Sequence, residues 1–235
     1  MTQTPTAQGD TFTNPDLADM LERLGNEGSA ESFYRGDIAE QIAAAFAANG
    51  GIVTTDDLAA YRALEHRPIR VEYGDHVVLG PPPPCPSATP LEALAICREL
   101  GWETLAPGVA RTHARVEATR LAWRDRFHHI ADPEGKAAAT DRLLSAEYVA
   151  ELAGEVREAV AAQKAIETGI GAGEAPGTLH FSAVDREGGM VSMTLTHGAS
   201  FGACVTVPGL GLTLGHGMTR FDAGTPNSMG PRKRP

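Results

Sequence analysis

The pattern of apolar and polar residues changes sharply at the bond between Gly177 and Thr178. Helical periodicity dominates the chain before it, which ends in the glycine-rich stretch IETGIGAGEAPG. The chain after it alternates apolar and polar residues in LHFSAVD and GMVSMTLT, on either side of the turn residues 186–189. Such alternation around glycines predicts a β-hairpin. Helices first and strands last predict an α+β fold, with a helical segment at 1–177 and a β-rich segment at 178–235 within part of one domain.

The helical part of the sequence contains several amphipathic segments. Pro15 and a following glycine, Gly25 or Gly28, delimit PDLADMLERLGNEG as a first helix. The longer stretch SAESFYRGDIAEQIAAAFAANGG predicts one continuous helix, and DDLAAYRAL a short one. Further helices are predicted near 91–100 and 109–130, and over SAEYVAELAGEVREAVAAQ. The helix near 109–130 is indicated by spacings of three, four or seven between Val109, His113, Val116, Trp123, Phe127 and Ile130. Between these helices, IRVEYGDHVVLG predicts two short strands about a Gly74–Asp75 turn.

Composition narrows the possible functions. The net charge of −10 and the lack of a basic stripe argue against a nucleic-acid partner. No apolar run approaches the length of a membrane-spanning helix. The three cysteines form no CxxC pair and indicate buried or inert thiols, and the pair His128–His129 has no further ligand at a useful spacing. We therefore expect no metal and no organic cofactor. The segment PPPPCPSATP is too proline-rich for regular structure and is typical of a rigid spacer.

The junction at Gly177 and Thr178 has two interpretations. It can be a surface linker that leads into a hairpin, or a bond that the protein cuts itself. If the bond is cut, Thr178 gains a free α-amino group, whose pKa of about 7.7–8.0 lets it act as a base near neutral pH. The threonine hydroxyl would then have its general base on the same residue.

Several motifs in the correct order resemble the γ-glutamyltransferase (γ-glutamyltranspeptidase) family. They are FYRGDIAEQIAAAFAANGGIVTTDDLAAYRALEHRPI, PPPPCPSATPLEAL, LAWRDRFHHIADPEG, SAEYVAEL and GTLHFSAVDREGGMVSMTLT, with the remaining C-terminal residues. PPPPCPSATPLEAL stands where the family has a triple-proline turn that leads into a helix. The resemblance covers nearly the whole chain and implies an N-terminal nucleophile hydrolase fold, an αββα sandwich that this chain contains only in part. It also implies self-cleavage between Gly177 and Thr178, as in a zymogen.

The same resemblance assigns roles to residues near the junction. Thr178 is the expected nucleophile, whose Oγ attacks an amide to form an acyl-enzyme that water or an amine resolves. Thr196, on the paired strand, is the second threonine that steadies the nucleophile. His180 falls on a threonine-x-histidine position, where we expect a structural role. Leu179 departs from the family, which usually has a second threonine there.

Three positions that hold the α-amino group of a glutamyl substrate in the family have changed. Gly198 stands in place of an asparagine, Gly217 in place of a polar residue, and Arg220 in place of a carboxylate in MTRFD. A guanidinium repels an ammonium group and pairs with a carboxylate. We therefore assign these residues, with Asp222, to substrate binding, and expect an acylase for a substrate such as a glutaryl amide. The alternative is that Arg220 merely pairs with Asp222 or Asp185 at the surface.

The resemblance also implies missing parts and partners. The family's arginine for the substrate α-carboxylate would lie before this chain, and its paired-serine oxyanion segment after it, so we expect the middle of a longer protein or one part of a hetero-assembly. The expected partners are a small-molecule amide and, after cleavage, the protein's own second fragment. No secretion signal is visible, which predicts a cytoplasmic location, although family members are often exported. A non-catalytic, unprocessed remnant remains an alternative to the enzyme.

Overall fold

The structure, a computed structural model, describes residues 7–132, 139–169, 178–199, 201–231 and 233–234. It groups into two compact units. The first unit combines Met1–Ala63 with Ala175–Gly217, and the second combines Leu64–Glu174 with Met218–Pro235. Each unit therefore draws on both of the segments predicted on either side of Gly177.

The described part of the first unit contains four helices and four strands that are short or exposed. The helices are α1 (Pro15–Glu27), α2 (Glu31–Arg35), α3 (Asp37–Ala48) and α4 (Thr55–Ala60), and the strands are β3 (Leu179–Val184), β4 (Met190–Leu195), β5 (Thr206–Val207) and β6 (Leu212–Thr213). Its core consists of buried apolar side chains from α1, α3 and the β5–β6 hairpin: Met20, Ile38, Ile42, Ala45, Val207, Leu210 and Leu214. Ile38, Ile42 and Ala45 are buried and form the inner face of α3.

A single side chain links the start of α1 to the β5–β6 hairpin. The Oδ1 atom of Asn14 accepts from the backbone N–H of Leu17 at 3.1 Å and so caps the helix. The Nδ2 atom of Asn14 donates to the carbonyl of Gly211 at 2.8 Å. Gly211 has φ of 58°, and a Cβ atom there would lie 2.1 Å from Asn14 Oδ1. The turn between β5 and β6 therefore requires glycine at this position.

The prediction of one continuous helix over SAESFYRGDIAEQIAAAFAANGG is wrong, because Gly36 interrupts it. Gly36 has extended backbone angles, φ of −125° and ψ of −158°, between the end of α2 and the start of α3. A Cβ atom at Gly36 would lie 2.9 Å from the Cα of Ser32. Glycine therefore permits a sharp change of direction that the hydrophobic periodicity does not reveal.

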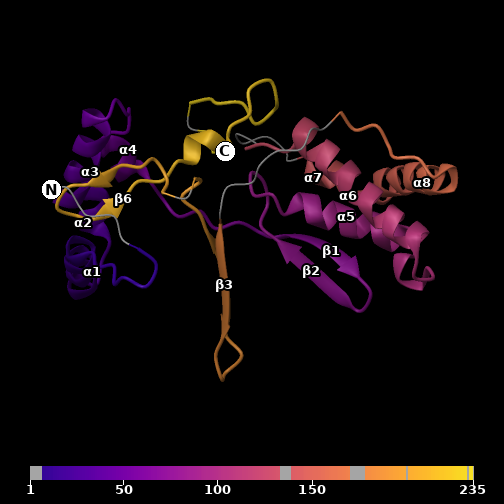
Figure 1. Ribbon diagram of the computed structural model, residues 1–235, viewed down its shortest axis with the longest axis horizontal. Coiled ribbons are helices and arrows are strands. Elements are labelled where there is room, and N and C mark those ends of the chain that lie inside the picture. The colour runs from indigo at the N-terminus through magenta and orange to yellow at the C-terminus, as the bar shows by residue number, and fades with distance from the viewer. Residues whose placement is uncertain (1–6, 133–138, 170–177, 200, 232, 235) are drawn as a thin grey trace. The chain divides into compact units, whose positions relative to one another are not determined.

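The second unit is a helical layer beside a hairpin (Figure 1). Its elements are β1 (Ile69–Tyr73), β2 (His76–Gly80), α5 (Ala88–Glu99), the 3₁₀ turn η1 (Trp102–Thr104), α6 (Val109–His129), α7 (Thr140–Leu143) and α8 (Ala146–Ala162), followed by the C-terminal segment. The predicted pair of strands about Gly74 and Asp75 is confirmed, with Tyr73 opposite His76. The largest core cluster joins α5, α6 and α8 through residues such as Ile96, Leu121 and Leu152, each fully buried.

The polyproline segment turns toward α5 instead of running straight. The N–H of Cys85 donates to the carbonyl of Pro82 at 3.2 Å, and the hydroxyl of Ser87 donates to the carbonyl of Pro81. Helix α5 begins at Ala88, directly after this turn. The segment therefore acts as a helix-leading turn, as the family resemblance implies, and the prediction of a plain rigid spacer is corrected.

Helix α6 buries a different face from the one that its apolar spacing suggests. Val109 and Trp123 are 87% and 44% exposed. The buried positions are mostly small or acidic: Ala114, Glu117, Ala118, Leu121, Ala122 and Asp125. The helix itself is confirmed, but small residues and paired carboxylates form its buried face. Alanine side chains are small enough to let neighbouring helices approach closely, which explains why alanines occupy the buried face.

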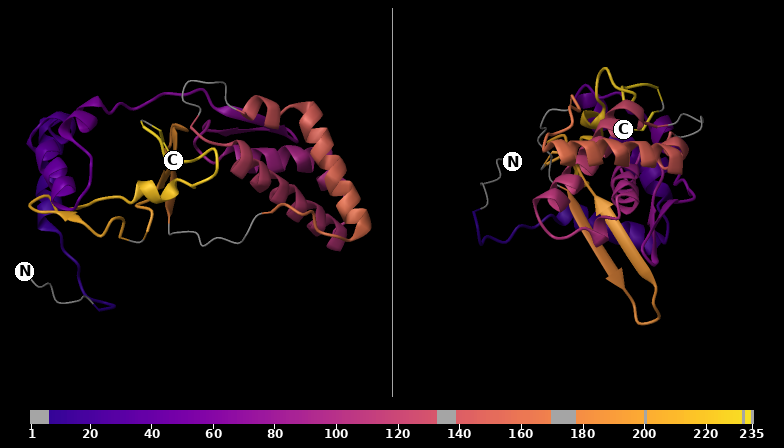
Figure 2. Two further views of the ribbon diagram at one scale, coloured as in Figure 1. Left: turned by 90° about the horizontal axis from the view of Figure 1, so that it is seen from above. Right: turned by 90° about the vertical axis from the view of Figure 1, so that its right-hand side faces the viewer.

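The described strands form three separate two-stranded antiparallel sheets, β1–β2, β3–β4 and β5–β6. The β3–β4 hairpin is the longest of the three, and the orange strands of Figure 2 show it as an open ribbon. Every residue of β3 and β4 is exposed. The predominance of helices in the N-terminal part and of strands in the C-terminal part is confirmed.

A buried acidic group lies among α5, α6 and α8. Glu92 is 1% exposed and Asp125 is 2% exposed. The hydroxyl of Tyr148 donates to Asp125 Oδ2 at 2.6 Å, and Arg124 lies 3.3 Å from Asp125 Oδ1. Burial raises the pKa of Glu92 to about 9, and the negative charge of Asp125 adds to the shift. Glu92 is therefore protonated at neutral pH.

This acidic group predicts a pH-dependent stability. Between pH 4.5 and about 9 the folded protein keeps a proton on Glu92 that the unfolded chain releases. The free energy of unfolding should therefore fall as the pH rises through this window. When the pH rises from 5.5 to 8.5, the free energy of unfolding should fall less in Glu92→Gln than in the wild type, because glutamine cannot ionise. The two decreases should differ by at least about 1.4 kcal/mol, which corresponds to one pKa unit. Urea unfolding at both pH values measures this difference.

Glu151→Gln is the matched control, because Glu151 is an exposed residue of α8. It should keep the wild-type pH dependence. If Glu92→Gln shows the same decrease of the unfolding free energy with pH as the wild type, the assignment of the proton to Glu92 is contradicted.

Candidate active site

The β3–β4 hairpin brings the two predicted catalytic threonines opposite each other. Leu179 pairs with Leu195 in the antiparallel register, so Thr178 and Thr196 face each other one position beyond the ladder. Thr178 Oγ1 lies 3.5 Å from Thr196 Oγ1, a longer separation than a strong hydroxyl hydrogen bond. Both threonines are exposed. Gly177, the other side of the predicted cleavage bond, lies outside the described residues.

The turn that closes the hairpin fixes this register. The backbone N–H of Asp185 donates to the carbonyl of Gly189 at 2.9 Å, and Asp185 Oδ1 accepts from the N–H of Gly189 at 2.7 Å. Gly188 between them has φ of 87°. Because a slip by one residue would turn every side chain to the other face, this closed turn keeps Thr178 and Thr196 together. The carboxylate of Asp185 is engaged here, within the hairpin.

Thr196 is positioned from its other side by Gly198. The backbone N–H of Gly198 donates to Thr196 Oγ1 at 3.0 Å. Gly198 is buried with φ of 87°, and a Cβ atom there would lie 2.9 Å from the carbonyl oxygen of His216. The N–H of His216 in turn donates to the carbonyl of His197 at 2.7 Å. The backbone N–H of Gly198 therefore orients the Thr196 hydroxyl, in addition to the absence of a side chain at this position.

A row of polar side chains continues from the threonines along the same face of the hairpin. His180 Nδ1 lies 2.8 Å from Thr194 Oγ1, and His180 Nε2 lies 3.2 Å from Ser192 Oγ and 3.3 Å from Ser182 Oγ. In the described part of the chain, no hydrogen bond joins His180 to Thr178. This arrangement favours the structural role expected for His180. The sequence analysis did not single out Ser182, Ser192 or Thr194, although their alternate spacing places them on one face.

The remaining predicted binding residues lie around the turn η2 (Gly217–Arg220). Gly217 is exposed with nothing within 4 Å of a Cβ position, so no steric requirement explains glycine there. The carbonyl of Arg220 accepts from Asn227 Nδ2 at 2.7 Å, and the N–H of Asp222 donates to the carbonyl of Asn227 at 3.1 Å. No ion pair joins Arg220 to Asp222 among the residues that the structure describes, which counts against that surface pairing.

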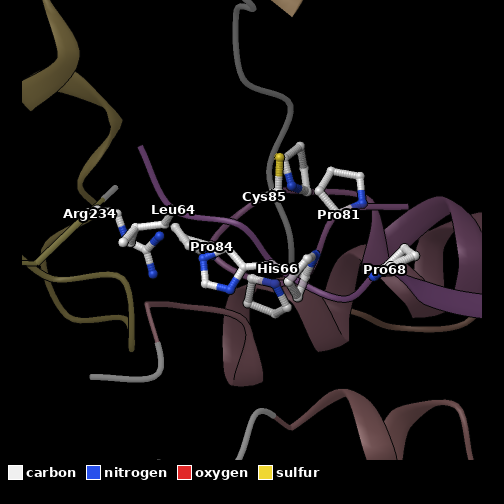
Figure 3. A pocket seen from close by; sticks show the side chains of 10 residues that line it. Leu64, His66, Pro68, Pro81, Pro84, Cys85 and Arg234 are labelled. Carbon is white, nitrogen blue, oxygen red and sulfur yellow. The ribbon is translucent and has the colours of Figure 1, made fainter. Parts of the chain in front are cut away.

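A pocket of about 560 Å³ opens beside the polyproline turn of the second unit (Figure 3). Proline rings form most of its wall, with Leu64, His66, Cys85 and Arg234. Arg234 is already paired with Asp132, which accepts from its Nε and Nη2 atoms, each at 3.0 Å. None of the predicted site residues lines this pocket. We therefore place the candidate active site at the threonines and not here.

The described residues hold no group of three or more histidine, cysteine or acidic side chains suited to a metal ion. His128 and His129 lie exposed at the end of α6, where His128 Nδ1 is 2.6 Å from the carbonyl of Arg124. Cys97 is buried, whereas Cys85 and Cys204 are exposed. Among the described helices, none is long and apolar enough to cross a membrane.

A threonine at the head of a strand, faced by a second threonine across an antiparallel hairpin, is the arrangement expected of an N-terminal nucleophile hydrolase. The chain belongs to the gamma-glutamyltranspeptidase family, whose sequence profile matches residues 1–235. It is 33% identical, over 98% of its length, to the glutathione hydrolase proenzyme of Pseudomonas sp. (strain A14), of which it covers 43%. It is equally 33% identical, over 98% of its length, to the acylase ACY 1 proenzyme of Pseudomonas sp. (strain V22), of which it covers 41%.

Solved structures support the same fold. Cephalosporin acylase from Bacillus halodurans matches with a TM-score of 0.77 and 29% identity, over 96% of this chain and 40% of that one. The N-terminal nucleophile hydrolase fold implied by the sequence motifs is thereby confirmed. This chain spans about two fifths of the length of the relatives that it matches.

The geometry of Gly198 predicts a stability effect that Gly217 should not share. Gly198→Ala should lower the free energy of unfolding by about 1–3 kcal/mol, because a side chain is strained at this φ and meets the His216 carbonyl. Gly217→Ala is the matched control and should change it by less than about 0.5 kcal/mol. Urea unfolding followed by circular dichroism measures both. Equal losses at the two glycines would contradict the role assigned to Gly198.

Proposed function

We propose that this chain carries the nucleophile of a γ-glutamyltransferase-like amidohydrolase or acyltransferase, which cuts itself between Gly177 and Thr178. The observation that supports this proposal is the pairing of Thr178 with Thr196, whose oxygen atoms lie 3.5 Å apart at the open end of a hairpin. A plain linker into a hairpin has no need for a second hydroxyl at that position. The two products of the cut would remain associated as a heterodimer.

The proposed self-cleavage uses the Thr178 hydroxyl on its own peptide bond. Thr178 Oγ1 attacks the carbonyl carbon of Gly177, and the nitrogen of Thr178 leaves with a proton. The resulting ester between Gly177 and Thr178 is hydrolysed by water, which frees the Gly177 carboxylate, the Thr178 hydroxyl and the Thr178 α-amine. The amine is then available as the base that the hydroxyl lacked before cleavage.

The proposed reaction with substrate repeats this chemistry on an external amide. The neutral α-amine takes the proton from Thr178 Oγ1 as the oxygen attacks the amide carbon, and the leaving amine receives the proton. The acyl ester on Thr178 is then resolved by water or by an acceptor amine. Thr196 supports this step, because its Oγ1 is held by the N–H of Gly198 and accepts from the hydroxyl of Thr178. This contact holds the attacking oxygen in a fixed direction.

Self-cleavage is tested by denaturing mass spectrometry of the purified protein. The wild type should give two fragments, 1–177 and 178–235, and Thr178→Ala should give a single full-length mass. Thr178→Ser should still be cut, since it keeps a hydroxyl at the same place. Thr194→Val is the matched control, because Thr194 lies on the same hairpin and contacts His180 instead of Thr178. A wild type that stays intact favours a non-catalytic, unprocessed domain.

The acyl group of the substrate is proposed from the charge at Arg220. The relatives include both glutathione hydrolases and acylases at the same identity, so their names alone favour neither substrate. Arg220 stands where the family has a carboxylate for the substrate ammonium, and the asparagine and polar side chain that assist it are replaced by Gly198 and Gly217. A guanidinium there favours an acyl group with a carboxylate, such as glutaryl, over γ-glutamyl. Retained γ-glutamyl specificity is the alternative.

This specificity predicts the outcome of a substrate comparison. The enzyme should release aniline from glutaryl anilide at least about tenfold faster, in kcat/KM, than from γ-glutamyl anilide. Arg220→Asp should reverse the preference, since it exchanges the cation for a carboxylate. Lys233→Gln, which removes a positive charge farther along the C-terminal segment, is the control. A clear preference of the wild type for γ-glutamyl anilide would contradict the proposal.

A further inference from the structure

A histidine on the β3–β4 hairpin contacts hydroxyl groups through both of its ring nitrogen atoms. His180 Nε2 lies 3.2 Å from Ser192 Oγ and 3.3 Å from Ser182 Oγ. On the other side of the ring, His180 Nδ1 lies 2.8 Å from Thr194 Oγ1. All four residues belong to the first unit and to one antiparallel ladder, in which His180 pairs with Thr194 and Ser182 pairs with Ser192. Their geometry therefore depends on this hairpin alone.

The hydrogen bonds among these groups run in one consistent direction. The hydroxyl of Ser182 donates to Ser192 Oγ at 3.3 Å, which leaves the proton of Ser192 available for His180 Nε2. A neutral imidazole that accepts at Nε2 carries its own proton on Nδ1, where Thr194 Oγ1 can accept it. A hydroxyl beside a base that a third group orients is the arrangement of an activated nucleophile.

The histidine adds a chemical capacity that the hydroxyl groups do not have by themselves. Cross-strand hydroxyl pairs such as Ser182 and Ser192 stabilise a hairpin without any histidine. An imidazole that is held at both nitrogen atoms strengthens the hairpin and also presents a general base to Ser192. Both serines are exposed on the open ribbon of Figure 2, so a solute can reach them.

The next pair of residues along the same face is apolar. Val184 pairs with Met190, and the alternation of side chains places both on the face that carries Ser182 and Ser192. Their side chains are largely exposed, 67% for Val184 and 81% for Met190. This pair offers an apolar contact beside Ser192, which favours a substrate with an apolar acyl group.

We propose that Ser192 and His180 form a second nucleophile–base pair, separate from Thr178, which reacts with carboxylic esters whose acyl group is apolar. Ser192 Oγ attacks the ester carbonyl carbon while His180 Nε2 takes its proton, and the alcohol leaves with that proton. Water then hydrolyses the acyl ester on Ser192, which releases the carboxylic acid and restores the serine. Thr194 is a positioning residue, because it acts through His180. General-base catalysis of this kind contributes about 10²–10⁴-fold in rate.

The test is covalent labelling of the whole 235-residue protein with an alkyl fluorophosphonate, which reacts with activated serine hydroxyls. Ser192 Oγ should bond to phosphorus as fluoride leaves and His180 takes the proton. Trypsin separates the two serines, because it cuts after Arg186. Ser192 then lies in the peptide Glu187–Arg220, and Ser182 lies before the cut. Fragmentation of the labelled peptide in the mass spectrometer identifies the modified residue.

Ser29 provides an internal reference for an ordinary exposed serine. Its hydroxyl oxygen accepts from the backbone N–H of Glu31 at 3.1 Å. Ser192 should be labelled at least about tenfold faster than Ser29. The alkyl probe should also label Ser192 several-fold faster than a probe with an ethylene glycol chain, because Val184 and Met190 contact the alkyl chain. Equal labelling of Ser29 and Ser192 would overturn the nucleophile, and equal rates with the two probes would overturn the apolar preference.

The decisive variant is His180→Gln, which keeps a polar side chain but removes the base. It should slow the labelling of Ser192 at least about tenfold. His76→Gln is the matched control, since His76 is an exposed histidine of the β1–β2 hairpin, and it should keep the wild-type rate. An unchanged rate in His180→Gln would overturn the proposal.

Two variants of Thr194 test the base in a hairpin that keeps its strands. Thr194→Val removes the oxygen that orients His180, while valine suits a strand well. It should slow the labelling of Ser192 several-fold, and Thr194→Ser, which restores the oxygen, should recover the wild-type rate. Equal rates in these two variants would overturn the role of Thr194, whatever effect His180→Gln has on the hairpin.

Thr178→Ala separates this inference from the proposed function. The proposed self-cleavage is lost in this variant, whereas the label on Ser192 should remain, because the base for Ser192 is His180. A wild type that carries the label on Thr178 and not on Ser192 would overturn the second nucleophile and leave the proposed function intact. A label on Ser192 in a wild type that never cleaves itself would support the second nucleophile and refute the proposed function.

Discussion

The antiparallel register of β3 and β4 is the constraint on which the candidate active site depends. Thr178 and Thr196 are 18 residues apart in the chain, and only the pairing of Leu179 with Leu195 brings their hydroxyls to 3.5 Å. The turn at Asp185–Gly189 fixes that pairing through its two hydrogen bonds to Gly189. The exposure of the whole hairpin means that its own ladder and turn, and not burial in a core, determine where the threonines lie.

Within the second unit, buried charge is handled in two different ways. Near Glu92 the protein avoids a second negative charge by keeping a proton, while Asp125 is satisfied by Tyr148 and Arg124. Arg126 keeps its charge at ordinary pH. Each arrangement leaves one buried polar atom without a hydrogen-bond partner among the described residues, Oε1 of Glu92 and Nη1 of Arg126.

Much of this arrangement could be predicted from the sequence, because it rests on local patterns. The hairpin follows from strict alternation about a glycine turn. The roles of Thr178 and Thr196 were expected from the family resemblance alone. The break at Gly36 could not be predicted, since a glycine within a periodic run is often tolerated in a helix. The buried face of α6 could not be predicted either. Its alanines and carboxylates are buried by helix packing and by ion pairing, and neither appears in a hydrophobic pattern. The backbone role of Gly198 and the unsatisfied Nη1 of Arg126 depend on contacts between residues distant in the chain, and no sequence spacing encodes them.

The central claim is that Thr178 becomes the first residue of a new chain, with hydroxyl and base on one residue. Labelling of free α-amines in the folded protein, followed by trypsin digestion and peptide mapping, tests this directly. Trypsin cuts after Lys164 and Arg186, so the account predicts the peptide Thr178–Arg186 with the label on its threonine nitrogen. Recovery of only the continuous, unlabelled peptide Ala165–Arg186 would contradict it.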